Sequence, residues 1–246
     1  MKCIILVIAS KGKFYNEMAK IWKRYMNRNK DIKCFFIYGN DAGIKADGNT
    51  IIAPCKETRA PGILNKTIHA FKHVTKKYEY DYIFRTNLSS FVLLDRIGAY
   101  LDTLPDKNCY CSEFHYPNPV SNRDVYPTLK KLGLAEGFGW GNGAGIILSR
   151  DLVQNIINNE KKLHKRLIDD VSLGVYLHKL SNVEKIKQLR YKFVKYQPKK
   201  VVTEEQLSKG IRELKSSNHF HVRIKNPANR NRDIEIQKRL FNIFYK

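Results

Sequence analysis

Apolar runs and amphipathic segments alternate through the first half of the chain. The run at residues 3–9 is continuous, and apolar side chains then recur at helical spacing over residues 18–26. Two further runs occupy residues 34–38 and 51–53, and a second helical pattern covers residues 63–77. Continuous apolar runs are typical of parallel strands buried on both faces, and strand–helix–strand units connect such strands with a right-handed crossover. The pattern predicts an α/β fold with a central, mostly parallel sheet flanked by helices.

A fourth apolar run, residues 80–84, contains no Gly or Pro, and we expect it to form a buried strand at the centre of the sheet. The polar residues that follow it directly are Arg85, Thr86, Asn87, Ser89 and Ser90. Open α/β sheets bind ligands at the carboxyl ends of their strands, so these residues are candidates for a binding site. Asn and Ser are also ordinary turn formers, and a purely structural role therefore stays open.

The second half of the chain has a less regular pattern. The irregular segment 113–131 is rich in Pro, Asn and aromatic residues, and its Tyr116 and Tyr126 could either stack on a ligand or serve in packing. Five glycines between residues 137 and 145 precede an expected strand. The patterns predict helices over residues 92–104, 204–214 and 234–244, and strands over residues 108–112, 146–148, 192–196 and 219–225.

The chain is strongly basic, with 45 Lys and Arg against 23 Asp and Glu and a formal charge of +22. Such a surface favours anionic partners, which include nucleic acids, anionic membranes and phosphorylated small molecules. The cations occur singly or in pairs and never in a long block, which is typical of a solvated surface. No helix-turn-helix, zinc-finger or single-strand stacking pattern accompanies them, so we expect no specific nucleic-acid partner.

The cysteines and the first apolar run bear on the compartment. The five cysteines are an odd number, and those in apolar strands resemble small buried hydrophobes, which favours a reducing compartment. Cys109 and Cys111 have no second pair at zinc-ligand spacing, so we interpret them as structural. Residues 3–9 are too few to span a membrane and lack the pattern of a signal peptide. We therefore expect a soluble, cytoplasmic protein.

Residues 81–92, DYIFRTNLSSFV, match the frame of a strand that carries a DxD motif. The segment resembles GT-A type glycosyltransferases of the β-1,3-glycosyltransferase and Fringe-like families. Asn87, Leu88 and Ser89 stand where those families have aspartates, so the motif is degenerate. The resemblance implies one GT-A domain over residues 1–246, with a nucleotide-binding half at 1–112 and an acceptor-side half with a C-terminal extension at 113–246. It also implies a divalent metal, Mn²⁺ or Mg²⁺, which the missing acids argue against.

Two later segments extend the resemblance. Residues 137–152 resemble a segment that carries acceptor and donor-sugar contacts, which by likeness fall on Trp140, Gly141, Asn142 and Gly143. Residues 167–175 resemble a motif that carries the general base, which places Asp170 in that role and Asp169 second. Glycosyl transfer needs such a carboxylate to accept the proton of the attacking hydroxyl. Acids that open a helix also serve as caps, and one of the two could do only that.

Further donor contacts come from cations and small polar groups. By likeness Arg59, Lys66, Arg85, Thr86, Asn87 and Ser89 face the nucleotide, although Arg59 and Lys66 could equally be surface charges at a helix start. Residues 219–225 alternate with strand period, so one face carries His219, His221, Arg223 and Lys225. The two histidines could ligate a metal, whereas Arg223 and Lys225 would stabilise a departing nucleoside diphosphate without metal. A solvated face of an edge strand is the alternative.

Three hypotheses about function follow. The first is an inverting hexosyltransferase that moves a sugar from a nucleotide sugar, a UDP-sugar by likeness, to a hydroxyl of a glycan or glycoprotein, with Asp170 as base. The second is a catalytically inactive GT-A domain that binds a nucleotide or glycan, because the DxD acids are missing. The third is a basic nucleic-acid-binding protein, which the charge alone supports.

Overall fold

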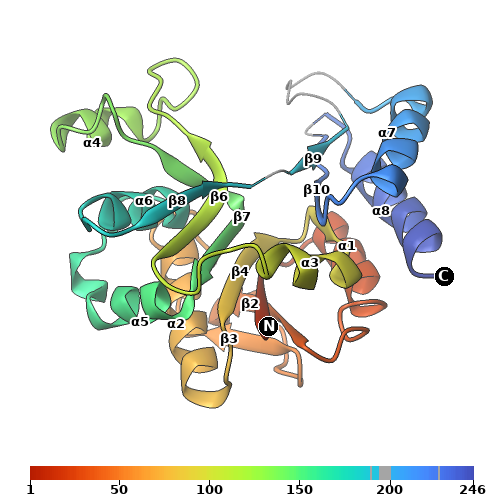
Figure 1. The fold of residues 1–246 in the computed structure, drawn as a ribbon, viewed down its shortest axis with the longest axis horizontal. Helices are drawn as coiled ribbons and strands as arrows, with labels where there is room; N and C mark the ends of the chain where they lie inside the picture. Colours follow the sequence, from red (N-terminus) through yellow and green to blue (C-terminus); the bar gives the residue numbers. More distant parts are fainter. Residues whose placement is uncertain (189, 194–200, 227) are drawn as a thin grey trace.

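The computed structural model describes residues 1–188, 190–193, 201–226 and 228–246 (Figure 1). Its main sheet has seven strands in the order β3-β2-β1-β4-β7-β6-β8, so β4 lies at the centre. Only β7 runs antiparallel to its neighbours, which confirms the predicted mostly parallel sheet. The strands are β1 (Cys3–Ile8), β2 (Ile32–Gly39), β3 (Thr50–Ala53), β4 (Tyr82–Asn87), β6 (Cys109–His115), β7 (Trp140–Ser149) and β8 (Glu184–Lys187).

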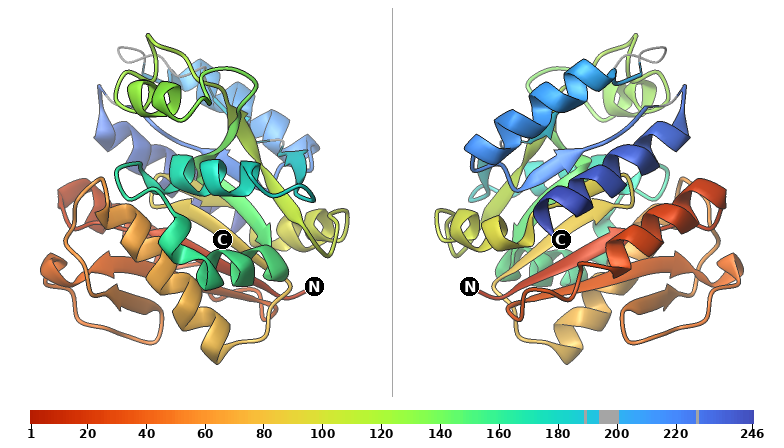
Figure 2. Two further views of the ribbon diagram at one scale, coloured as in Figure 1. Left: turned by 90° about the vertical axis from the view of Figure 1, so that its left-hand side faces the viewer. Right: turned by 90° about the vertical axis from the view of Figure 1, so that its right-hand side faces the viewer.

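Helices cover both faces of this sheet (Figure 2). The alternation of β1 explains why: Ile5 packs into one apolar cluster and Leu6 into another, on opposite faces of the strand. The left-hand view of Figure 2 faces the helices of one layer and the right-hand view faces those of the other. The first layer holds α2 (Gly62–Lys77), α5 (Arg150–Asn158) and α6 (Asp169–His178), and the second holds α1 (Lys13–Lys23), α3 (Leu94–Leu101), α7 (Glu204–Ser216) and α8 (Arg230–Phe244).

A smaller sheet joins the C-terminal region to the end of β4. Its strands are β5 (Ser90–Val92), β10 (His221–Arg223) and β9 (Tyr191–Lys192), in the order β5-β10-β9. The turn between β4 and β5 is fixed from two sides, because Trp22 Nε1 and Gln237 Nε2 both donate to the Leu88 carbonyl, at 3.3 and 2.8 Å. The polar residues after β4 are therefore held by helices from both ends of the chain.

Two sequence predictions need correction. The glycines from Gly141 onward lie inside β7 rather than before it. A glycine is needed within the strand at position 145, because a Cβ there would lie 2.5 Å from the buried His221 ring. Residues 113–131 are only partly irregular, since β6 continues to His115 and α4 (Tyr126–Lys131) follows. Ser149 stands at the N-cap position of α5, and its hydroxyl accepts a bond from the Cys109 amide.

Other elements agree with the pattern or fall outside the description. Short 3₁₀ turns occur at η1 (Asn40–Ala42) and η2 (Glu160–Lys162). The strand expected at residues 192–196 overlaps β9 at its first residue, and residues 194–196 lie outside the described part. Within the described residues, none of the helices combines the length and the apolar character that a membrane crossing requires.

Candidate functional site

A cavity of about 870 Å³ opens where the carboxyl ends of β1 and β4 meet β7, the start of α6 and the smaller sheet. Ile8 of β1 and Asn87 of β4 are register partners, and both line it. The site therefore lies at the edge of the sheet that the sequence predicts. The charged side chains in its lining are two carboxylates and seven cations: Asp169, Asp170, Arg59, Arg85, Arg190, Lys192, Arg223, Lys225 and Arg230.

The first carboxylate, Asp169, is fixed in the wall of the cavity. Its Oδ2 lies 2.7 Å from Arg85 Nη2, and the two side chains are only 0% and 5% exposed. Thr67 Oγ1 donates to the same oxygen at 2.8 Å. Asp169 is thus neutralised by a buried ion pair, and its remaining Oδ1 has no hydrogen-bond partner within the described residues.

The second carboxylate, Asp170, faces the cavity. Its Oδ2 accepts a bond from the Gly143 amide at 2.9 Å, and its Oδ1 accepts one from Val171 at 2.8 Å. Burial and the neighbouring Asp169 raise the pKa of Asp170 to about 6, although Arg85 and the two amides oppose the shift. A carboxylate of this kind is ionised at neutral pH and more basic than an exposed one, which suits a general base.

Gly143 explains why this arrangement needs a glycine in β7. A Cβ at this position would lie 2.8 Å from Asp170 Oδ2 and 2.9 Å from Arg85 Nη1. The backbone of β7 can therefore approach the carboxylate closely only without a side chain. The glycine-rich stretch shapes the part of the cavity beside Asp170 through this contact.

Cations gather at the end of the cavity that lies beyond β4, beside Asn87 and Ser89. Arg223 Nη1 donates to both Asn87 Oδ1 and Ser89 Oγ, each at 2.5 Å. Lys225 and Arg230 line the same end. Burial and the neighbouring cations Arg190 and Arg230 lower the pKa of Arg223 to about 9, so its guanidinium keeps its charge at neutral pH.

The sequence of residues 61–188, just over half of the chain's 246 residues, matches the model of one protein family, described as galactosyltransferase. The chain belongs to the galactosyltransferase family. This confirms the resemblance inferred from the segments around Asn87 and Asp170. No curated protein matches the sequence of this galactosyltransferase-family chain.

One solved structure reaches a TM-score of 0.50 with the galactosyltransferase-family chain and supports the GT-A fold. An active-site mutant of LgtC is 9% identical over 97% of this chain and 96% of its own, with a TM-score of 0.50. The galactosyltransferase LgtC, solved with donor and acceptor sugar analogues, is 10% identical over the same shares, with a TM-score of 0.48. A mannosyltransferase from Pyrobaculum calidifontis, solved with GDP-Man and Mn²⁺, is 12% identical over 76% of this chain and 54% of its own, with a TM-score of 0.44. At these identities the likeness concerns the fold alone.

The side chains at the degenerate DxD positions of this galactosyltransferase-family protein do not fit a divalent metal. Asn87 and Ser89 are neutral, and both already accept a bond from the Arg223 cation, which would repel a metal ion. Among residues 1–188, 190–193, 201–226 and 228–246, no group of three or more His, Cys, Asp or Glu could hold a metal ion.

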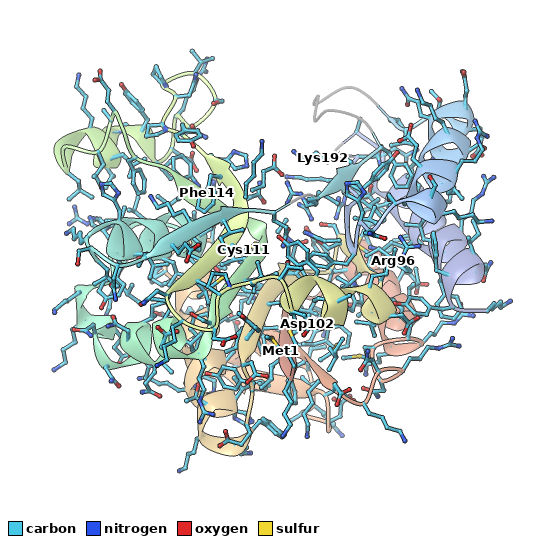
Figure 3. The ribbon with its side chains drawn as sticks, viewed as in Figure 1. Met1, Arg96, Asp102, Cys111, Phe114 and Lys192 are labelled. Carbon is cyan, nitrogen blue, oxygen red and sulfur yellow. The ribbon has the colours of Figure 1, made fainter. Side chains whose placement is uncertain are left out.

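The two histidines predicted as metal ligands lie away from the cavity lining. His221 is fully buried, and its ring nitrogens lie 3.0 Å from Gln188 Oε1 and 3.1 Å from Ser90 Oγ. Burial and the nearby Arg190 and Arg223 lower its pKa well below the usual value. His219 Nδ1 lies 2.9 Å from Ser217 Oγ, and the His219 carbonyl accepts a bond from Arg96, labelled in Figure 3. Both rings take part in structural contacts.

Four other residues that the sequence predicts to contact substrate do not line the cavity, because their side chains or backbone make contacts within the protein. Lys66 is 1% exposed because its Nζ lies 2.9 Å from both Glu57 Oε2 and the Ala9 carbonyl. Thr86 is buried and donates to the Ala144 carbonyl at 2.6 Å. Trp140 and Gly141 pack behind the cavity, against Phe138 and Tyr110. These residues support the site without lining it, whereas the other predicted contacts line it: Arg59, Arg85, Asn87, Ser89, Asn142, Gly143, Asp169, Asp170, Arg223 and Lys225.

Several lining residues escaped the sequence analysis. Arg190 and Lys192 both form ion pairs with Glu113 of β6, and Arg190 Nη1 donates to Asn142 Oδ1 at 3.2 Å. Figure 3 labels Lys192 and Phe114, and so shows the two segments that these ion pairs join. No local motif marks the two cations. The other polar lining residues missed are Ser10, Tyr15, His115, Ser121 and Arg230. Ser10 follows β1 almost directly and could have been found by the strand-end rule.

Proposed function

We propose that this galactosyltransferase-family protein transfers a sugar from a nucleotide-sugar donor, a UDP-sugar, to a hydroxyl group of a glycan or glycoprotein, with inversion at the anomeric carbon. The observation that carries the proposal is the position of Asp170, which lines one cavity together with Arg223, Lys225 and Arg230. An inverting displacement needs both a base for the acceptor and positive charge for the departing anion, and this cavity offers both.

Asp170 acts as the general base in this mechanism. The acceptor hydroxyl donates its proton to the Asp170 carboxylate as its oxygen attacks the anomeric carbon. The new carbon–oxygen bond forms on the face opposite to the bond that breaks, and the nucleoside diphosphate leaves with the electron pair. The amides of Gly143 and Val171 hold the carboxylate in position for this step.

The two halves of the chain divide the substrates in this proposal. Residues 1–112 supply the end of β4 and the loop after β1 to the donor. Residues 113–246 supply β7, α6 and the acceptor side, and their C-terminal extension adds Arg223 to the donor side. Asn142 and Gly143 line the cavity beside Asp170, so we assign them to the transferred sugar or the acceptor. Arg59, Arg85 and Arg223 are assigned to the donor.

The substitution Asp170→Asn tests the role of the base. The amide keeps the shape of the side chain but cannot accept the proton, so we expect kcat to fall by about 10²–10⁴-fold while donor affinity stays within about twofold. Steady-state kinetics measure the first quantity, and calorimetric titration with a UDP-sugar measures the second. Asp95→Asn, at an exposed acid in the first turn of α3, is the matched control. An Asp170→Asn enzyme with full turnover would refute the assignment.

A non-catalytic protein is the second candidate, because Asn87 and Ser89 are neutral where the resembled families carry acids. Such a protein would bind a nucleotide or glycan in the same cavity and transfer nothing. Thermal stabilisation by a panel of nucleotide sugars identifies a bound donor, since a ligand specific for the folded state raises the melting temperature. Transfer or donor hydrolysis above a buffer blank would then eliminate this candidate.

A further inference from the structure

The guanidinium of Arg223 lies at the positions where the resembled families hold their metal-binding acids. One nitrogen, Nη1, bridges Asn87 Oδ1 and Ser89 Oγ, and the Ser89 hydroxyl also donates to Asn87 Oδ1 at 3.1 Å. Both neutral side chains accept bonds from the cation and add no charge of their own. The degenerate motif is therefore a binding site for an arginine of this chain.

Two further cations extend this arrangement along the cavity. Lys225 follows Arg223 by two residues, and Arg230 opens α8. Arg230 forms an ion pair with Asp233, a fully buried carboxylate that also accepts two bonds from Asn226, at 2.8 and 2.6 Å. Lys225 and Arg230 thus add two cations beside Arg223 in this part of the cavity.

These cations offer positive charge to the ligand that a divalent metal ion would otherwise bind, the diphosphate of the donor. The diphosphate of a nucleotide sugar carries two negative charges, which is the charge that a divalent cation balances in a metal-dependent site. In a metal-dependent site, the charges of two carboxylates and a divalent cation sum to zero before the donor binds. In this chain, the side chains themselves carry the positive charge that meets the diphosphate. Arginine also presents several donors in a fixed plane, which suits the oxygens of phosphate groups.

The cations also destabilise one another when the cavity holds no anion. Burial together with Arg190 and Arg230 lowers the pKa of Arg223, and burial together with Arg223 and Arg230 lowers that of Lys225. A dianionic ligand would relieve this repulsion on binding. The site is therefore organised for an anion before the ligand arrives, without reorganisation of solvent at the moment of reaction.

We propose that Arg223, Lys225 and Arg230 bind the donor diphosphate in place of a divalent cation, with Arg223 held in position by Asn87 and Ser89. The proposal rests on the proposed function only where it names the ligand a nucleotide sugar. As the sugar–phosphate bond breaks, the negative charge that develops on the leaving phosphate oxygen is stabilised by these three cations.

Calorimetric titration with UDP tests the proposal in the full-length chain. We expect the dissociation constant of UDP to stay within about twofold when EDTA replaces Mn²⁺, and to rise about 50-fold or more in Arg223→Gln, since charged hydrogen bonds to a buried ligand are lost. Arg212→Gln, at an exposed arginine of α7, should bind as the unaltered protein does. Loss of UDP binding in EDTA, or normal binding by Arg223→Gln, would overturn the proposal.

A designed reversal gives a second, independent readout. The triple variant Asn87→Asp, Ser89→Asp, Arg223→Ala replaces the guanidinium by two carboxylates, so its UDP binding should be restored by Mn²⁺ and abolished by EDTA. Circular dichroism and melting temperature establish that each variant is folded. Binding by the triple variant that ignores both Mn²⁺ and EDTA would count against the proposal.

Inorganic pyrophosphate separates this proposal from the proposed function. Binding of pyrophosphate in EDTA that depends on Arg223, without binding of UDP, would support the cation site and refute the UDP-sugar donor. Binding of UDP only in the presence of Mn²⁺ would refute the cation site and leave the glycosyltransferase intact. Failure of pyrophosphate and UDP alike in EDTA would overturn the cation site.

Discussion

The two ends of the cavity differ in how their charges are balanced. At the acid end, Asp169 forms a buried ion pair with Arg85, and backbone amides hold Asp170. At the cation end, Arg223 contacts two neutral side chains, and Arg230 forms an ion pair with Asp233. The first end thus holds the ionised Asp170 beside a neutralised ion pair, and the second gathers cations around Arg223.

This difference indicates a division of labour. A base must be held at a fixed place with a controlled pKa, so it benefits from saturated hydrogen bonding. An anion site gains most from charge that is not already neutralised by the protein. Substitutions at either end, each compared with a matched substitution elsewhere, should therefore have different consequences.

The largest effect on stability is expected from Arg85→Met. This substitution leaves the Asp169 carboxylate buried without its cation, and breaking a buried pair in this way costs about 3–5 kcal/mol. Arg150→Met is the reference, because Arg150 pairs with Glu79 at the surface and such pairs contribute about 0–1 kcal/mol. Urea unfolding measures both. Equal losses in the two variants would show that the buried pair is not the support of the acid end.

A smaller effect is expected from Gly143→Ala. The new Cβ would lie under 3 Å from Asp170 Oδ2 and Arg85 Nη1, so both must shift, at a cost of about 1–3 kcal/mol and with loss of turnover. Gly98→Ala in α3 meets nothing within 4 Å and should instead stabilise the protein by about 0.4–1 kcal/mol. Thermal unfolding and kinetics compare them. Full activity in Gly143→Ala would contradict the close approach of β7 to the base.

The sequence predicted β1, β2, β3 and β4 because each is a short, largely buried apolar run. It did not predict β8, whose residues Glu184–Lys187 are charged and mostly exposed. It also located both ends of the cavity, through the polar residues after β4 and the acids that open α6. The strand period at residues 219–225 correctly grouped Arg223 with Lys225. It failed for His221, because periodicity gives the face of a strand and not the depth at which other elements cover it.

Other parts of the site depend on tertiary packing that no local pattern records. The glycines of β7 have low strand propensity, and they form a strand because side chains such as Asp170 lie directly against its backbone. Arg190, Lys192 and Arg230 reach the cavity from three separate elements or loops. Their convergence follows from the docking of the smaller sheet and α8, which the sequence pattern does not specify.

The smallest effect concerns pH, and it should separate the two ends. Because the pKa of Asp170 is raised to about 6, kcat/KM should fall about tenfold per pH unit below that value. Arg223 keeps its charge over the same range, so affinity for a UDP-sugar, whose diphosphate does not titrate there, should stay constant. A pH–rate profile and titrations from about pH 5 to about pH 8 measure the two responses. If kcat/KM and the affinity for the UDP-sugar fell together at low pH, the two ends would not have the separate roles proposed.

The free energy of unfolding should also depend on the protonation of Asp170. It should fall as the pH rises, whereas kcat/KM should increase. Folding raises the pKa of Asp170 above its ordinary value of 3.8, so the folded chain binds this proton more tightly than the unfolded chain does. The resulting stabilisation is complete below about pH 4 and is lost as the pH rises through about 6. Asp170→Asn removes the titration, so the unfolding free energy of the unaltered protein should fall relative to the variant across this window. A difference that does not change with pH would mean that burial and Asp169 do not perturb Asp170.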